Sequence, residues 1–193
     1  MKLVFATHNP GKLKEIQQLL PKSIELLSLG DLKFTNEIEE TADTLSENAL
    51  IKARCIAGKF KMNVFADDSG LEVAALHGAP GVYSARYAGP DQIAENNIAK
   101  MLKEMRGKSD RKAVFKTVIA LVLDGKEFTF EGTIEGDITT ERRGAQGFGY
   151  DPIFKPHGFE QTFAEMNPSQ KNSVSHRAQA VNKLVDFLKQ NNG

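Results

Sequence analysis

The apolar positions of this chain first form a short strand and then a helical stripe. Residues 2–6 are a run of mostly β-forming side chains, which predicts a buried strand. Asn9 and Pro10 are residue types that begin helices, with Asn at the N-cap and Pro in the first turn. The apolar stripe of that helix follows at Leu13, Ile16, Leu19 and Leu20. A second strand is expected near residues 24–27.

The middle of the chain repeats this alternation. Thr44 and Glu47 have the spacing of a capping box, and the apolar stripe behind them predicts a helix to about Phe60. Residues 63–66 predict a short strand that ends in a polar turn at residues 67–70. A Gly- and Pro-rich loop follows, and Asp91 is expected to cap a helix that reaches Arg106.

Two long strands dominate the last third. Residues 113–123 and 126–134 are separated by Asp124 and Gly125, a strong two-residue hairpin signal. A glycine-rich loop occupies residues 144–149, and a last helix is expected over residues 175–189. Strands and helices intermix, with a long hairpin inserted. The pattern therefore predicts an α/β fold with a mixed sheet, and 193 residues suit one domain, 1–193.

Charge and composition narrow the function. Lys plus Arg equals Asp plus Glu at 25 each, so the chain lacks the basic excess of a nucleic-acid binder. Its one cysteine permits no intrachain disulfide, which favours a reducing compartment. The apolar N-terminal run is too short for a signal peptide, and no run reaches membrane-spanning length. We expect a cytoplasmic protein without a membrane partner.

The first candidate site is the strand-to-helix junction at residues 7–12. Free backbone N–H groups and the helix dipole make such a junction a site for anions, and Gly11 allows close approach. Lys12 is informative because a cation in a first turn opposes the dipole, a conflict that a bound phosphate removes. The alternative is a capped turn with a solvated lysine. The segment is not a P-loop, because the GxxxxGK[ST] spacing is absent.

The second candidate is acidic. Asp67 and Asp68 follow an apolar strand, where ligand sites form in α/β sheets, and adjacent carboxylates repel unless a cation or proton intervenes. Together with Glu37, Glu39 and Glu40 they offer the few carboxylates that Mg²⁺ prefers. One of them at a strand end can also activate water. The alternative is a plain acidic turn and a solvated loop.

Two further candidates lie in the last third. Phe148 or Tyr150 can stack on a base, with backbone amides or Asp151 at its edge, or both rings belong to the core. Lys171, His176 and Arg177 lie at or near the start of the last helix, where an anion or a carbonyl partner explains the cations; a solvated helix start is the alternative. The four histidines lack zinc spacing, and no GxSxG elbow is present.

These motifs together are more specific than any one. In order along the chain they are Thr7-x-Asn9-x-x-Lys12, Asp67-Asp68-Ser69-Gly70-Leu71, Gly78-Ala79-Pro80-Gly81-Val82-Tyr83-Ser84-Ala85-Arg86, Phe148-Gly149-Tyr150-Asp151-Pro152 and Lys171-Asn172-x-x-Ser175-His176-Arg177. The chain resembles, over essentially its whole length, the inosine/xanthosine triphosphate pyrophosphatase family in its bacterial form. The resemblance implies a homodimer, an elongated mixed central sheet with flanking helices, and two lobes around a nucleotide cleft. It also implies dITP, ITP and XTP as substrates.

The resemblance also implies roles for residues. Asp68 would be the general base and a Mg²⁺ contact, with Glu40, Glu39 or Glu37 as the second metal carboxylate. Phe148 would stack on the base, and Arg177 would reach the purine 6-oxo group. The substrate-binding residues implied are Thr7, His8, Asn9, Pro10, Gly11, Lys12, Lys52, Ser69, Phe148, Gly149, Tyr150, Asp151, Lys171, His176 and Arg177.

The expected reaction is attack of water on the α-phosphorus, with pyrophosphate leaving and Mg²⁺ and lysines offsetting its charge. Three other functions stay open. They are a related pyrophosphatase for pyrimidine or modified nucleotides, a nucleotide sensor without catalysis, and a nucleic-acid-binding module, which the neutral charge disfavours.

Overall fold

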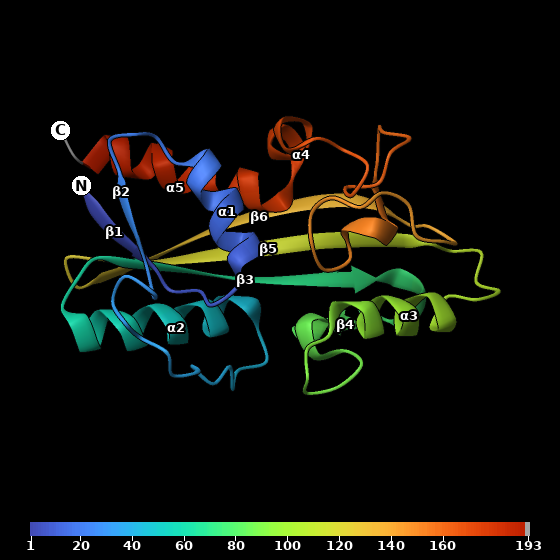
Figure 1. The fold of residues 1–193 in the computed structure, drawn as a ribbon, viewed down its shortest axis with the longest axis horizontal. Coiled ribbons are helices and arrows are strands. Elements are labelled where there is room, and N and C mark those ends of the chain that lie inside the picture. The colour runs from blue at the N-terminus through green and yellow to red at the C-terminus, as the bar shows by residue number, and fades with distance from the viewer. Residues whose placement is uncertain (192–193) are drawn as a thin grey trace. The chain divides into compact units, whose positions relative to one another are not determined.

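A computed structural model describes residues 1–191 of the chain (Figure 1). Short 3-10 turns lie at Ala74–Leu76, Ser84–Arg86 and Asp151–Ile153. The helices and strands are, in order, β1 (Lys2–Phe5), α1 (Pro10–Leu19), β2 (Glu25–Ser28), α2 (Leu45–Phe60), β3 (Val64–Val73), β4 (Pro80–Gly81), α3 (Ala94–Glu104), β5 (Lys112–Leu123), β6 (Lys126–Ile138), β7 (Phe154–Pro156), α4 (Pro168–Val174) and α5 (His176–Asn191).

The strands form a mixed sheet in the order β2-β1-β3-β5-β6-β7, with β4 paired to β3. β1 runs parallel to β2 and to β3, whereas β3/β4 and β6/β7 are antiparallel pairs. Asp124 and Gly125 both have positive φ between β5 and β6, as a tight hairpin turn of this type requires. The predicted α/β class with a mixed sheet is therefore confirmed.

The chain divides into two compact units, and each is described by itself. Unit 1 comprises residues 1–68, 117–132 and the chain from Arg177 onward. Unit 2 comprises residues 69–116 and 133–176. The prediction of one domain over residues 1–193 stays a prediction, and residues 192–193 lie outside the described part.

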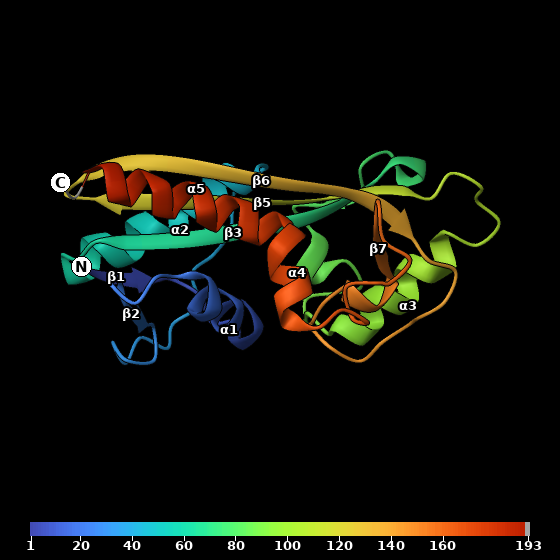
Figure 2. The same ribbon diagram turned by 90° about the horizontal axis from the view of Figure 1, so that it is seen from above.

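Unit 1 has a sheet covered on both faces, because successive side chains of a strand point to opposite sides. Leu3, Phe5 and Phe65 pack with Ile16 of α1 and with the apolar side of α5. Val4, Ala6, Val64 and Ala66 pack instead with Ala49, Ala53 and Ile56 of α2. Figures 1 and 2 show α2 on one face of these strands and α1 and α5 on the other.

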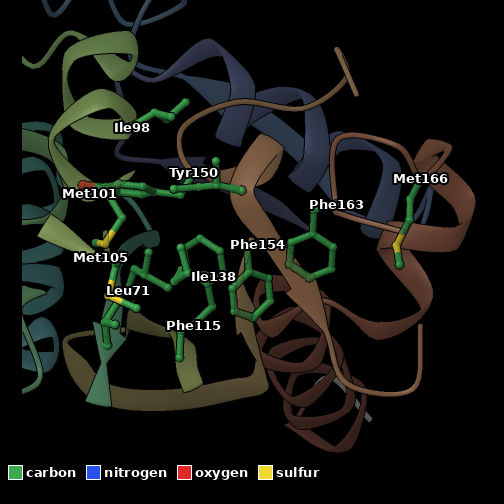
Figure 3. Close-up of a cluster of buried hydrophobic side chains, with 13 residues drawn as sticks. Leu71, Ile98, Met101, Met105, Phe115, Ile138, Tyr150, Phe154, Phe163 and Met166 are labelled. Carbon is green, nitrogen blue, oxygen red and sulfur yellow. The ribbon is translucent and has the colours of Figure 1, made fainter. Parts of the chain in front are cut away.

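Unit 2 has a core of its own, drawn in Figure 3. Phe115 of β5, Phe154 of β7 and Phe163 pack edge to face or tilted, with ring centroids 4.6 and 5.2 Å apart for the pairs Phe115–Phe154 and Phe154–Phe163. Ile98, Met101 and Met105 bring α3 into the same cluster. The residues of this segment that face the core recur every three or four positions, as the sequence pattern predicts.

The predicted polar turn at residues 67–70 is wrong. β3 does not end at Ala66 but continues through these residues to Val73. Polar residues and glycine usually interrupt a strand, but β3 lies between β1 and β5 in the sheet. Its pairings with β1 at residues 64–65 and with β4 at residues 71–72 flank this polar stretch. Basic side chains from the helices also neutralise the two aspartates, as described below.

The predicted start of α3 and the short α4 also differ from expectation. α3 begins at Ala94, with Ile93 at the N-cap position and no side-chain cap. Gln92 takes a left-handed φ of 54°, which turns the chain between Asp91 and the helix, so Asp91 is not the cap. α4 was not predicted, although Asn167 and Gln170 form a full capping box at its start. Among residues 1–191, no helix has the length and apolarity needed to span a membrane.

Candidate active site

The strand-to-helix junction is a capped turn whose side chains hold its own backbone. Asn9 Oδ1 accepts a hydrogen bond from the Lys12 N–H at 3.1 Å, and Thr7 Oγ1 accepts one from the Asn9 N–H at 3.2 Å. Pro10 lies in the first turn, as predicted. His8 Nε2 donates to the Asn36 carbonyl at 3.0 Å, and its ring stacks on Phe34. The junction is thus fixed in one conformation, with His8 tying it to the following loop.

Asp67 and Asp68 are neighbours in sequence but face opposite sides of β3. Asp67 has the parity of Phe65 and lies on the side covered by α1 and α5. Asp68 has the parity of Ala66 and lies on the side covered by α2. The two carboxylates, 1% and 6% exposed as residues, are therefore served by different cations.

On the first side, Asp67 is held by two cations. Its Oδ1 lies 3.1 Å from Lys12 Nζ, and its Oδ2 accepts from Arg177 Nε at 3.2 Å. Arg177, 2% exposed, also donates from Nη1 to Glu15 Oε2 at 2.5 Å. These four side chains form the Asp67 network, in which two cations balance two carboxylates.

The Asp67 network resolves the helix-dipole conflict of the sequence. Lys12 lies in the first turn of α1 and Arg177 in the first turn of α5, where cations are unfavourable. The Asp67 carboxylate compensates both cations. Burial acts to raise the pKa of Asp67, but Lys12 and Arg177 hold that pKa below its ordinary value. Burial lowers the pKa of Lys12, and Asp67 opposes this change.

On the second side, Asp68 lies beside Lys52. Lys52 Nζ lies 3.6 Å from Asp68 Oδ1 and also donates a hydrogen bond to Glu40 Oε1. Lys52 comes from the middle of α2, and Glu40 from the loop that precedes it. Lys52, Asp68 and Glu40 form the Asp68 network. Burial raises the pKa of Asp68, and the nearby Lys52 and Lys12 do not cancel that effect.

The donor set of the Asp68 network fits a divalent cation. It contains two carboxylates against one ammonium and so retains one negative charge. Mg²⁺ is a hard cation that binds one or two carboxylates together with water and substrate phosphates. Residues 1–191 contain no group of three or more His, Cys, Asp or Glu side chains that could hold a metal by themselves. The arrangement suits a metal shared with a substrate.

In unit 2, Asp151 and Lys171 form the centre of the aromatic loop. Asp151 Oδ2 accepts from Lys171 Nζ at 2.5 Å and from the Phe148 N–H at 2.8 Å. Lys171 Nζ also lies 5.1 Å from the centroid of the Phe148 ring. Tyr150 is buried, and its hydroxyl donates to the Ser84 carbonyl at 2.8 Å. Tyr150 is therefore a core residue here, whereas Phe148 is only partly buried.

The glycines of this loop differ in what an added side chain would contact. A Cβ on Gly147 would collide with the Asp151 carboxylate, and one on Gly144 would collide with the backbone of Ala164. Gly149 has a φ of 59° but no protein atom within 4 Å of an added Cβ. Gly144 and Gly147 thus serve loop packing, and Gly149 is the one next to open space.

The remaining predicted residues are placed as follows. His176 is 3% exposed, and its ring stacks on Phe115 with centroids 4.6 Å apart and planes 5° apart. Ser69 lies in β3 directly after Asp68 and is partly buried. Sequence reasoning missed Glu15, the second partner of Arg177. The signal was its position three residues after Lys12, which places both on one face of α1.

A cavity of about 800 Å³ in unit 2 is lined by none of these residues. It is lined by both charge signs, including Arg111, Arg143, Asp137 and Glu160. The Arg111 guanidinium is bonded to the backbone carbonyls of Met105, Ile138 and Thr139, which is a structural use of the side chain. Volume therefore does not mark the chemistry in this chain, and the buried charge networks are the better candidate site.

Known proteins resemble this chain along its whole length. The model of the Ham1 family matches residues 3–187. The dITP/XTP pyrophosphatase of Christiangramia forsetii is 55% identical over 188 residues, covering 97% of this chain and 99% of the relative. The enzyme of the same name from Flavobacterium johnsoniae is 51% identical over 188 residues, covering 97% and 98%.

Solved structures agree. The Ham1 protein of Staphylococcus aureus is 39% identical and superposes with a TM-score of 0.89 over 99% of this chain and 100% of that one. The match in fold covers the same length as the match in sequence. On this evidence, the chain belongs to the Ham1 family.

Proposed function

We propose that this protein hydrolyses the non-standard purine nucleotides ITP, dITP and XTP to the monophosphate and pyrophosphate, with Mg²⁺ as cofactor. The observation that carries the proposal is the Asp68 network, in which the buried Asp68 of β3 and the partly buried Glu40 share one lysine and leave one negative charge in excess. The relatives named dITP/XTP pyrophosphatase, at up to 55% identity over nearly the full chain, support the substrate class.

The proposed chemistry places Asp68 as general base. Asp68 accepts a proton from a water molecule as that water attacks the α-phosphorus, and the bond to the pyrophosphate oxygen breaks. The rise in its pKa caused by burial makes Asp68 a better proton acceptor than an ordinary aspartate. Bound Mg²⁺ would supply charge stabilisation of the phosphate oxygens. The residues that would hold it are Asp68 and Glu40, because Glu40 hydrogen-bonds with Lys52 beside Asp68, which favours Glu40 over Glu39 and Glu37.

The phosphates are assigned to unit 1. The capped junction at residues 7–12 offers a fixed helix start, and Lys12 and Lys52 supply positive charge. Lys12 is already held by Asp67, which keeps it in one position before substrate binds. Such preorganised charge costs little rearrangement during reaction.

The base is assigned to Phe148, Gly149, Tyr150 and Asp151, with Ser69, Lys171, His176 and Arg177 as further contacts. The lysine–aspartate pair fixes the loop, and the partly buried Phe148 ring is the stacking group. Tyr150 acts by holding the loop to Ser84. Arg177 donates to Glu15 and Asp67, so its guanidinium is held in one place whatever it contacts on the substrate.

A substrate panel tests the proposal. Pyrophosphate release is measured with dITP, XTP, dATP, dGTP and dCTP, with Mg²⁺ and with the metal chelated. A buried donor that faces the 6-amino group of dATP instead of a 6-oxo group costs about 1–3 kcal/mol, so dITP should exceed dATP by about tenfold to a hundredfold.

The other outcomes identify the alternatives. Equal rates for dATP and dITP would contradict the selectivity, and a preference for dCTP would indicate a pyrimidine or modified-nucleotide enzyme. Nucleotide binding without pyrophosphate release in any metal would indicate a sensor. A single domain over 1–193, a homodimer and a cytoplasmic location remain parts of the proposal, which sedimentation and fractionation address.

A further inference from the structure

Lys52 occupies the place between the two carboxylates proposed as metal ligands. Its ammonium hydrogen-bonds Glu40 Oε1 and lies 3.6 Å from Asp68 Oδ1. Its side chain is 11% exposed, against 9% for Asp68 and 23% for Glu40. The lysine is therefore enclosed with both acids rather than extended into solvent.

The position of Lys52 follows from its secondary structure. It lies in the middle of α2, one turn from the buried Ala49 and Ile56 that dock this helix on the sheet. Thr44 caps the helix start by accepting from the Glu47 N–H at 3.2 Å. Docking of α2 thus delivers the ammonium to the side of β3 on which Asp68 lies.

Electrostatics makes Lys52 and a divalent ion competitors. Two nearby carboxylates repel each other unless a cation lies between them, and the ammonium now performs that role. A divalent ion bound to the same oxygens would put two cations within a few ångströms of each other in a partly buried site, where charge repulsion is weakly screened.

We propose that Lys52 is the resident counter-cation of Glu40 and Asp68 in the substrate-free protein, and that a divalent cation binds these carboxylates in competition with its ammonium. The inference rests on the metal site of the proposed function and adds an order of events. When the metal displaces the Lys52 ammonium from Glu40 and Asp68, that ammonium can pair with the anionic phosphates of the substrate. Metal and nucleotide therefore bind with positive coupling, which is reciprocal.

The test is the affinity of the nucleotide-free protein for Mg²⁺, measured by titration calorimetry in three proteins. Lys52→Met removes the charge and keeps the length of the side chain. Lys59→Met is the matched control, because it removes one charge from an exposed position of the same helix. The expected result is at least about tenfold tighter Mg²⁺ binding by Lys52→Met and a change below about twofold for Lys59→Met. Unchanged or weaker binding by Lys52→Met overturns the inference.

Wild-type protein gives a second test that does not depend on the folding of a variant. Amine labelling read by mass spectrometry, with and without Mg²⁺, should show Lys52 labelled several-fold faster once the metal is present. Lys12, which forms an ion pair with Asp67, is the internal control. Labelling of Lys52 that does not change up to saturating Mg²⁺ contradicts the competition.

Both readouts are independent of hydrolysis. If no nucleotide is hydrolysed but Lys52→Met binds Mg²⁺ more tightly, the proposed function fails and the competition stands. If dITP is hydrolysed with Mg²⁺ but Lys52→Met binds the ion no better, the function stands and the competition fails.

Discussion

The two sides of β3 carry networks of opposite electrostatic character, although the aspartates that anchor them are adjacent. The Asp67 network joins Lys12, Arg177 and Glu15 and is balanced in charge. The Asp68 network joins Lys52 and Glu40 and has a negative charge in excess. The balanced side is suited to hold a structure in place, and the unbalanced side is suited to accept a cation.

The pKa values of the two aspartates move in opposite directions for a clear reason. Burial acts on both to raise the pKa, because both carboxylates lie in low dielectric. At Asp67 two cations within about salt-bridge distance outweigh burial, and the pKa falls. At Asp68 the nearest cation is shared with Glu40, and the pKa rises. Folding therefore strengthens Asp67 as an acid and weakens Asp68 as an acid, relative to an ordinary aspartate.

The largest effect is expected from Asp67→Asn. The change leaves Lys12 and Arg177 buried with one carboxylate fewer, and breaking a buried ion pair costs about 3–5 kcal/mol of folding free energy. Urea denaturation followed by circular dichroism measures the loss. A cost below about 1 kcal/mol would show that the Asp67 network does not stabilise the fold.

Asp68→Asn is the matched change one residue along the same strand. We expect turnover of dITP to fall by about a hundredfold or more, because the proposed base is removed. The free energy of unfolding should change by less than about 1 kcal/mol, since burial already opposes the ionised form of Asp68 in the folded protein. Turnover is followed by pyrophosphate release, and stability by the same urea titration. Near-wild-type turnover would exclude Asp68 as base and remove the functional contrast between the two sides.

A smaller effect sharpens the assignment of the second metal ligand. Glu40→Gln should raise the Mg²⁺ concentration for half-maximal rate by about tenfold, because one carboxylate of the pair is lost. Glu39→Gln makes the same chemical change at the adjacent residue and should leave that concentration near the wild-type value. A Mg²⁺ titration of the initial rate of dITP hydrolysis distinguishes the two. Equal shifts in both variants, or a larger shift in Glu39→Gln, would contradict the choice of Glu40.

Sequence patterns correctly predicted the elements that depend on interactions between residues close together in the chain. The Asn9 cap, the Asp124-Gly125 turn and the apolar stripes of α1 and α2 depend on neighbours a few residues away, and all are present. The strand at residues 63–66 was predicted too short, because its continuation through Asp67 and Asp68 depends on strands and cations that are distant in the chain. The start of α3 was misplaced because Gln92 takes a left-handed conformation that its residue type does not require.

The candidate site was predicted as a set of residues but not as an arrangement. The order of motifs led to the family resemblance, and the comparisons confirmed the family. The sequence left open whether Lys12 and Arg177 face an anion, a carbonyl group or solvent, whereas in the structure Asp67 and Glu15 pair with them. The roles of the individual site residues remain predictions.

The sequence by itself determined the residue types and the helix caps. It also determined that Asp67 and Asp68, as neighbours in the chain, point to opposite sides of any strand that contains both. Only the tertiary structure decided that a strand does contain both, and which helix covers each side. The physical reason is that Lys52 and Asp68, or Arg177 and Asp67, meet through the docking of helices on a sheet. Those contacts join residues 16 to 110 positions apart, and no local pattern of side chains specifies them.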